Sequence, residues 1–200
     1  MIPTNTRLQI VAAAAILASV VVRAESPGTE AQHFPNVALW TQHSTSVRFY
    51  DDLIKGRVVM INFMFTTCTS ICPRTTANLV KVEEILGERL GRNVWMISIS
   101  VDPANDTPEV LRRYAAQYDT KPGWSLVTGK QSDIDQIRRK LGAYDNDGDK
   151  TQHSGVLIYG NETTGQWAAM PALADPATIV RSVTRLVRSP KVTRTSSGLD

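Results

Sequence analysis

Cysteine and histidine are scarce in this chain of 200 residues, which holds two cysteines and three histidines. A closed structural zinc site takes four ligands, mostly cysteine and histidine. Two cysteines and one well-placed histidine are too few for such a site, so we exclude a zinc finger. Cys68 and Cys72 are the only pair in the chain that can form a disulfide.

An excess of charge of one sign is also absent. The chain has 22 basic and 19 acidic residues, a formal net charge of +3, and an isoelectric point near 9.0. Arg7 and Arg23 lie in the first 24 residues, which contain no acid, so the rest has 20 basic residues against 19 acidic ones. We find no basic stripe interleaved with aromatic residues, which a nucleic-acid groove requires. We therefore expect no nucleic-acid partner.

The chain also lacks an apolar run of the length that spans a bilayer, about 20 residues. Its apolar N-terminal segment, residues 8–22, is shorter and follows the single positive charge of Arg7. This pattern is typical of a secretory signal, and Val22-Arg23-Ala24 suits cleavage after Ala24. An uncleaved membrane anchor is the alternative. Either way we expect export to the periplasm, the outer face of the inner membrane or an equivalent envelope compartment.

What is present is ordinary for a globular protein, with 42% hydrophobic and 20% charged residues. This is enough apolar material for one buried core. Residues 25–36 are polar and contain two prolines and a glycine, which predicts a linker after the signal or anchor of residues 1–24. We expect one domain over residues 37–188 and a polar tail over residues 189–200.

Predicted strands and helices alternate along this domain. Continuous or alternating apolar runs predict strands, and apolar residues at helical spacing predict helices. The strands are expected at 47–50, 57–65, 93–101, 124–127, 155–159 and 166–170, and the helices at 76–90, 110–118, 133–141 and 177–187. This alternation, ended by a hairpin and a helix, predicts an α/β fold of thioredoxin-like type, with helices flanking a mixed central sheet.

Short polar segments mark the ends of several elements. Asp106-Thr107-Pro108 and Asp175-Pro176 predict helix starts, because a capping side chain followed by proline is typical of the first turn. Ser132 is the predicted cap of the helix at 133–141. Gly160-Asn161 predicts the turn of the last hairpin.

Cys68 and Cys72 lie between a predicted buried strand and a predicted helix. Residues four apart share one face of a helix, so a helical turn there would bring the two sulfurs together. The free N–H groups and the dipole of a helix start stabilise thiolate, the form that attacks disulfides and binds metal. A structural disulfide is the alternative, although a bridge over so few residues closes only a small loop.

His153 is the third candidate ligand. It lies just before the predicted strand at 155–159, and in a thioredoxin arrangement the loop before that strand faces the cysteine pair. Two thiolates with an imidazole favour Cu(I) and, with strain, Cu(II) or Zn(II). The other histidines, His33 and His43, lie outside this frame, and we assign them no role.

Several separated blocks of sequence occur in a specific order. Residues 65–73 read Phe-Thr-Thr-Cys-Thr-Ser-Ile-Cys-Pro, and residues 98–111 form a second block around Asp-Pro. Leu126-Val127-Thr128-Gly129 is the next block, and His153-Ser154 follows it. In this combination, over residues 45–187, the chain resembles the Sco/SenC family of copper chaperones for cytochrome oxidase assembly.

The resemblance implies a thioredoxin-like fold that binds one copper ion, Cu(I) or Cu(II), through Cys68, Cys72 and His153. It implies a metallochaperone that delivers copper to the binuclear site of a respiratory oxidase, or that reduces the cysteines there to thiols. The implied partner is the copper-accepting subunit of that oxidase or another copper protein.

The sequence departs from the family beside these ligands. Thr69-Ser70-Ile71 stands where many members have Pro-Asp followed by Val or Ile, and Gln152 stands where many have an acid. The acidic segment at 144–150 also differs from that of well-known members. None of these positions is an implied ligand, so the departures bear on the client protein rather than on the metal.

Two other functions would use the same cysteines. An exported thiol–disulfide oxidoreductase would use Cys68 as the nucleophile and Cys72 as the resolving thiol, acting on a thiol–disulfide partner. That chemistry does not require His153. A peroxidase of the peroxiredoxin type needs a proline in a fixed frame before its cysteine. Here that position holds Ile61 or Phe65, so we set this function aside.

Overall fold

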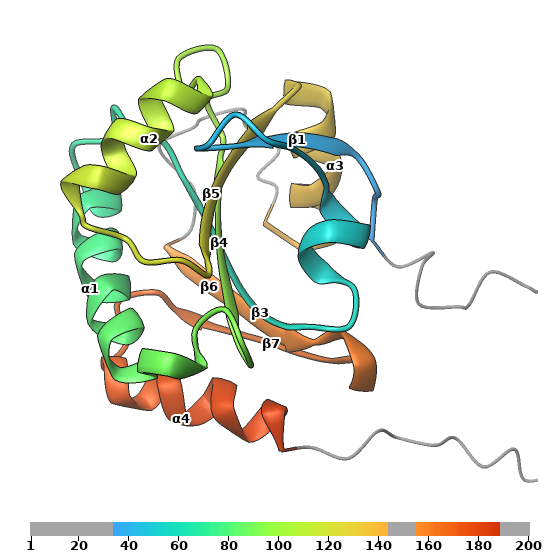
Figure 1. The fold of residues 1–200 in the computed structure, drawn as a ribbon, viewed down its shortest axis with the longest axis vertical. Helices are drawn as coiled ribbons and strands as arrows, with labels where there is room; N and C mark the ends of the chain where they lie inside the picture. Colours follow the sequence, from blue (N-terminus) through green and yellow to red (C-terminus); the bar gives the residue numbers. More distant parts are fainter. Residues whose placement is uncertain (1–33, 144–154, 189–200) are drawn as a thin grey trace, which may run out of the picture.

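A computed structural model describes residues 34–143 and 155–188, which form a seven-stranded sheet with helices on both faces (Figure 1). The strands are β1 (Ala38–Thr41), β2 (Ser46–Arg48), β3 (Val58–Met64), β4 (Trp95–Ser100), β5 (Trp124–Gly129), β6 (Val156–Asn161) and β7 (Gln166–Pro171). The helices are α1 (Ile71–Leu86), α2 (Pro108–Gln117), α3 (Gln131–Lys140) and α4 (Pro176–Val187). Short helical segments lie at Phe49–Ile54, Gly87–Arg89 and Glu162–Thr164.

The sheet is parallel at its centre and antiparallel at its edges. Its strand order is β2-β1-β5-β4-β3-β6-β7. β3, β4 and β5 run parallel, whereas β1 pairs antiparallel with β5, and β6 pairs antiparallel with β3 and β7. The predicted α/β fold, a mixed sheet flanked by helices, is confirmed.

β3 lies at the centre of the structure and all seven of its residues are buried. Successive side chains of a strand point to opposite faces of the sheet. Met60 therefore packs into one apolar cluster and Ile61 into the other. Because both faces are covered, the strand reads as a continuous apolar run in the sequence.

Helices from different parts of the chain cover the two faces (Figure 1). Leu79 of α1, Leu111 of α2 and Ile179 of α4 share one cluster with the sheet. Ile134 of α3 and Phe49 of the helical segment 49–54 lie in the other. Burying a side chain of this size contributes about 1.5–3 kcal/mol. The two clusters hold the sheet from both sides, so the chain leaves the end of β3 from a fixed position.

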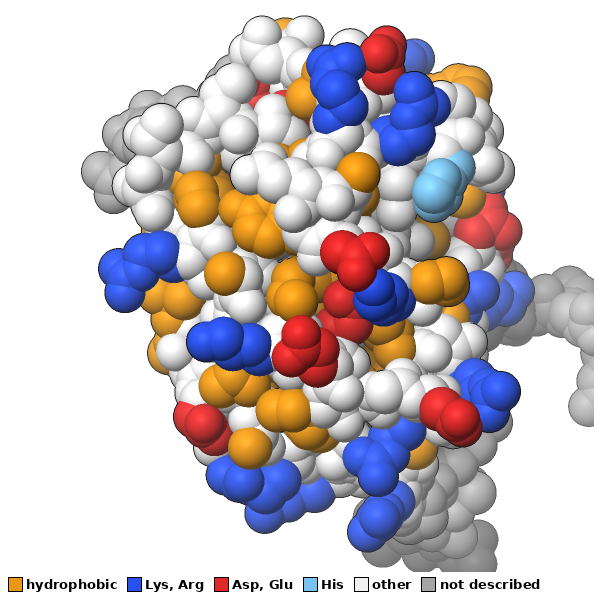
Figure 2. Space-filling model, turned by 60° about the vertical axis from the view of Figure 1, so that its left-hand side comes forward, with side chains coloured by type: hydrophobic (Ala, Val, Ile, Leu, Met, Phe, Trp, Pro, Cys, Tyr) orange, Lys and Arg blue, Asp and Glu red, His pale blue; other side chains and the backbone are white. Residues whose placement is uncertain are grey.

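The outer surface contributes less to stability. On the side that carries α1, basic and acidic side chains are interspersed among apolar ones (Figure 2). The ion pairs Arg113–Glu109 and Arg92–Glu88 are well exposed. Pairs of this kind contribute about 0–1 kcal/mol each.

Both predicted helix starts that carry a proline are confirmed. The Thr107 hydroxyl accepts a hydrogen bond from the Val110 N–H (3.3 Å) at the start of α2. The Asp175 carboxylate accepts one from the Thr178 N–H (2.8 Å) at the start of α4. At the first of these starts the cap is Thr107, which leaves Asp106 free for another contact.

The predictions near the end of the sheet were partly wrong. Gly160-Asn161 is not a turn: both residues lie in β6, where they pair with Trp167 and Gln166 of β7. The chain instead turns at residues 162–165. The Asn161 side chain accepts a hydrogen bond from the Thr163 N–H (3.0 Å), which caps the short helical segment there.

Several other helix and strand boundaries also differ from the predictions. α3 begins at Gln131, so Ser132 lies inside the helix and does not cap it. The strand predicted at 47–50 ends at Arg48, because the helical segment 49–54 starts there. α1 begins at Ile71 rather than at residue 76. β1 was not predicted, and it joins the sheet only through β2 and β5.

No helix within residues 34–143 and 155–188 is long and apolar enough to span a bilayer. The predicted signal or anchor, the tail at 189–200, the acidic segment at 144–150, His33 and His153 all lie outside the described residues.

Candidate functional site

The two cysteines lie where β3 leads into α1. After β3 ends at Met64, the chain makes a tight turn from Phe65 to Cys68, closed by a hydrogen bond from the Cys68 N–H to the Phe65 carbonyl (3.3 Å). α1 begins at Ile71, so Cys72 lies in its first turn and Cys68 precedes it. The pair therefore lies at the carboxyl end of the central strand.

The sulfur of Cys68 accepts a hydrogen bond from the backbone N–H of Cys72, with an N–S distance of 3.4 Å. This N–H is one of the first four of α1, which have no partner inside the helix. Ser70 occupies the capping position but makes no capping hydrogen bond to the helix. Its hydroxyl lies 3.7 Å from the Cys68 sulfur. The two cysteines do come together, but Cys68 caps the helix rather than lying on its face.

Both cysteines are free thiols, and both are buried, with 7% of Cys68 and 2% of Cys72 exposed. Their side chains are hydrogen-bonded to each other. In this structure the pair is a dithiol, which is the form that binds a metal ion.

The two thiols differ strongly in acidity. Burial opposes ionisation of Cys68, but hydrogen bonds from Cys72 and Ser70 outweigh it and lower the pKa of the Cys68 thiol below its ordinary 9.0. Burial, the hydrogen bond to Cys68 and the nearby charges of Cys68 and Asp106 raise the pKa of Cys72 to about 12. Cys68 is thus the more acidic thiol of the pair, and Cys72 keeps its proton more firmly.

The chain leading into β6 packs beside Cys72. Gly155 and Cys72 line the same small hollow, together with Ile71. A Cβ on Gly155 would lie 2.6 Å from the Cδ1 atom of Ile71, and the φ of +52° at this position also favours glycine. The Gly155 carbonyl accepts a hydrogen bond from the Ala172 N–H (2.7 Å). Gly155, the residue before β6, is therefore held against the first turn of α1.

Within residues 34–143 and 155–188, no group of three or more His, Cys, Asp or Glu side chains is placed to hold a metal ion. The cysteine pair supplies two sulfur donors there. His153, the third predicted ligand, lies outside the described residues, so its assignment stays a prediction.

The sequence model of the SCO1/SenC family matches residues 24–188. The chain belongs to the SCO1/SenC family. The SCO1 protein homolog of Bacillus subtilis is 39% identical over 90 residues, 44% of this chain and 46% of that protein. The mitochondrial SCO1 homolog of Homo sapiens is 27% identical over 115 residues, 57% of this chain and 38% of that protein. The chain thus spans about half or less of the length of these curated relatives.

Solved structures of SCO1/SenC proteins share the fold. Yeast Sco1 with copper bound matches with a TM-score of 0.62 and 25% identity, covering 76% of this chain and 90% of that one. BsSco, a member of the Sco family of cytochrome c oxidase assembly proteins with an identified disulfide switch, matches with a TM-score of 0.63 and 26% identity, covering 76% of this chain and 91% of that one. The predicted family and the thioredoxin-like fold are confirmed.

One buried residue beside the cysteine pair of this SCO1/SenC protein was not predicted from the sequence to be part of the site. Asp106 is 0% exposed, and its carboxylate accepts hydrogen bonds from Thr66, in the turn before Cys68, and from Ser100. The sequence contains a signal for it. Asp106 and Thr107 are two capping-type residues in succession, and a helix start needs only one of them.

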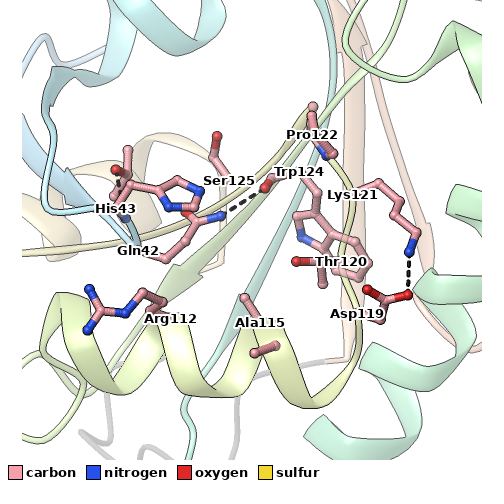
Figure 3. Close-up of a pocket in the computed structure, with 13 residues that line it drawn as sticks. Gln42, His43, Arg112, Ala115, Asp119, Thr120, Lys121, Pro122, Trp124 and Ser125 are labelled. Atoms are coloured by element: carbon pink, nitrogen blue, oxygen red, sulfur yellow. Dashed lines mark hydrogen bonds and ion pairs between the residues drawn. The ribbon is translucent and has the colours of Figure 1, made fainter.

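A larger hollow, of about 500 Å³, lies at the other end of the sheet, between the β1–β2 turn, α2 and the start of β5 (Figure 3). His43, Arg112 and the buried Trp124 are among the residues that line it. Asp119 at its rim is ion-paired with Lys121. Neither cysteine lines this hollow, so it is separate from the candidate site.

Proposed function

We propose that this protein binds one copper ion as its cargo through Cys68, Cys72 and His153, and passes it to the copper-accepting subunit of a respiratory oxidase. The observation that carries the proposal is the pair of free, buried, hydrogen-bonded cysteines at the start of α1. Thiolate sulfur is the ligand type that Cu(I) prefers, and an imidazole also suits copper in its Cu(II) state.

The chemistry of the cysteine pair fits copper. Cys68 ionises more readily than an ordinary cysteine, whereas Cys72 stays protonated, mainly because it is buried. A metal ion that binds both sulfurs displaces the Cys72 proton, and its positive charge offsets the cost of a buried thiolate. Copper uptake should therefore release a proton and depend on pH.

Covalent geometry supports His153 as the third ligand. The residue lies two positions before Gly155, and two peptide units span at most about 7 Å. Gly155 lines the same hollow as Cys72. This short separation from Gly155 supports His153 as the proposed third ligand.

The position of the pair and the family relationship both support transfer to a partner. Thr67 and Ser70, on either side of Cys68 in the chain, are exposed, so the site lies just below the surface. Yeast Sco1 holds copper, and BsSco belongs to a family of cytochrome c oxidase assembly proteins. We infer the same class of client for this protein.

The test is an anaerobic titration of the reduced protein with Cu(I) against a competing chelator, for the wild type, Cys68→Ser and His153→Ala. We expect one copper per chain in the wild type. Loss of an outer hydrogen-bond partner of a metal ligand weakens binding about 10–100-fold, and loss of a ligand should cost at least that.

The control is His43→Ala, which removes an exposed histidine that lines the hollow at the other end of the sheet. Its copper affinity should equal that of the wild type. Unchanged affinity in His153→Ala would remove His153 from the site, and weak uptake by the wild type would refute the copper proposal itself.

The different acidities of the two thiols favour a second candidate function, thiol–disulfide exchange. The Cys68 thiolate attacks a partner disulfide, forms a mixed disulfide and releases one partner thiolate. Cys72 then loses its proton and attacks Cys68, which forms the Cys68–Cys72 disulfide and releases the second partner thiolate. Two electrons pass from the protein to the partner. Two results together would favour this function. The wild type would bind copper weakly, and the His153→Ala variant would still reduce a partner disulfide.

We also propose that the protein acts in the cell envelope, with residues 1–24 as a signal cleaved after Ala24 or as an anchor through residues 8–22. The fold match to a SCO1/SenC family lipoprotein from Bacillus anthracis, with a TM-score of 0.67 and 24% identity, agrees with this site of action. Residues 25–36 would be the linker, residues 37–188 the copper-binding domain and residues 189–200 a tail. The intact mass of the protein recovered from the envelope fraction distinguishes the cleaved form from the anchored one.

A further inference from the structure

Asp106 is a fully buried aspartate in the loop between β4 and α2. Within the described part of the chain, no lysine, arginine or histidine forms an ion pair with it. A buried carboxylate without a cationic partner is retained only where hydrogen bonds satisfy it. The donors that satisfy it therefore indicate what Asp106 does.

The carboxylate of Asp106 joins two segments of the chain. Thr66 donates to it twice, from the backbone N–H (3.1 Å to Oδ2) and from the hydroxyl (2.5 Å to Oδ1). The Ser100 hydroxyl, at the end of β4, donates to Oδ2 (2.6 Å). The Asp106 N–H donates to the Asp102 carbonyl (2.9 Å), which fixes the aspartate from its own loop. Asp106 thus ties Thr66, the second residue after β3, to the end of the neighbouring strand β4.

Thr66 is the second residue of the turn that ends in Cys68. Hydrogen bonds from both its N–H and its hydroxyl to Asp106 fix the direction of that turn at two points. The same turn is closed by the hydrogen bond from the Cys68 N–H to the Phe65 carbonyl. Two residues past Thr66, the Cys68 sulfur meets the Cys72 N–H at 3.4 Å.

We propose that Asp106 is a positioning residue for Cys68, and that through Thr66 it holds the turn so that the two cysteines are in place before a ligand arrives. The inference rests on the proposed function, because a held cysteine pair matters for copper binding or for thiol exchange. A site that is ordered in advance does not have to order its turn during binding, which raises its affinity.

Glu162 provides a matched control. It is also a buried carboxylate, 7% exposed, and it accepts hydrogen bonds from the Tyr50 hydroxyl (2.8 Å) and the Gly56 N–H (2.7 Å). It follows Asn161, which pairs with Val58 at the other end of β3 from the cysteines. Glu162→Gln therefore disturbs a similar hydrogen-bonded carboxylate without touching the turn.

The experiment compares Asp106→Asn, Thr66→Ala, the double variant and Glu162→Gln in the full protein. The first readout is metal-free: the equilibrium between the dithiol and the Cys68–Cys72 disulfide in glutathione buffers. The second is Cu(I) affinity by chelator competition. Thermal unfolding of each variant reports its stability separately.

We expect Asp106→Asn to lower the equilibrium constant for closing the disulfide about tenfold, equivalent to roughly 30 mV, because the sulfurs are held together less of the time. Cu(I) affinity should fall about 10–100-fold. Thr66→Ala should shift both quantities in the same direction. The double variant should add little, since both changes disturb the same interaction between Thr66 and Asp106. Glu162→Gln should leave both at wild-type values, even where it lowers the unfolding temperature.

Wild-type values of both quantities in Asp106→Asn would overturn the proposal, as would equal shifts in Glu162→Gln, which would indicate general destabilisation. If Asp106→Asn does not fold, Thr66→Ala decides the question, because it keeps the aspartate and removes one of its donors. If the wild type takes up no copper, the proposed function fails, and the glutathione equilibrium still tests Asp106.

Discussion

The most direct consequence of the site geometry is that the two cysteines differ in reactivity. If the reduced protein is treated briefly with iodoacetamide at pH 8, we expect Cys68 to be alkylated well before Cys72. The reason is the hydrogen bond from the Cys72 N–H to the Cys68 sulfur, together with the deeper burial of Cys72.

The size of the difference follows from the two pKa values. With a pKa of about 12, roughly one Cys72 thiol in 10,000 is ionised at pH 8, whereas Cys68, with a pKa below 9.0, is ionised to at least about a tenth. The thiolate fractions thus differ about 1,000-fold. A thiolate of higher pKa is intrinsically more nucleophilic. With a Brønsted slope of about 0.4–0.5 over about three pK units, the Cys72 thiolate is roughly 15- to 30-fold more reactive than the Cys68 thiolate, which offsets part of this difference. Cys68 should therefore react on the order of 30-fold faster.

Peptide mass spectrometry after a timed quench measures the label on each cysteine. The control is the same protein in concentrated urea, where both thiols are exposed and should react at similar rates. Cys68→Ser should not convert Cys72 into a fast thiol, because burial is the largest cause of its raised pKa. Equal labelling of the two cysteines in the folded protein, or faster labelling of Cys72, would refute this account of the site.

Two further predictions concern stability. Gly123→Ala places a Cβ 2.5 Å from the Gly91 nitrogen at a φ of +102°, so urea unfolding should show a loss of more than about 1–3 kcal/mol. Gly56→Ala, at a φ of +71° with nothing within 4 Å, should lose less, and an equal loss would show that the contact is unimportant. Burial raises the pKa of Glu83 more than the hydrogen bond from the Lys121 N–H lowers it. Protonated Glu83 therefore favours the folded state, and this contribution to stability is lost as pH rises through the folded-state pKa. Glu83→Gln should therefore raise the urea midpoint of unfolding at pH 7. It should also make this midpoint vary less with pH between pH 4 and 7. A midpoint below that of the wild type at pH 7 would contradict this reasoning.

The central elements of the fold could be predicted because their signals are local. β3 and β4 read as apolar runs since both faces of the sheet are covered. The starts of α2 and α4 each combine a capping side chain with a proline. Such signals depend on a few neighbouring residues and hold whatever the rest of the chain does.

The errors lie where pairing with a distant segment decides the structure. β1 has four residues and belongs to the sheet because it pairs with β5, far along the chain. Gly160-Asn161 has the composition of a turn, yet pairing with β7 keeps both residues in β6. In each case, ladder hydrogen bonds and burial outweigh a weak local preference.

The same division applies to the site. The sequence by itself determined the chemistry: two cysteines four residues apart between a buried strand and a helix, in the motif order of the SCO1/SenC family. The tertiary structure decided how the pair is held. Cys68 caps α1 from outside the helix, and Asp106 reaches the turn before it from a loop 40 residues away. Local patterns report residue types and spacing, whereas the partners of a buried carboxylate are chosen only when the folded sheet brings distant segments together.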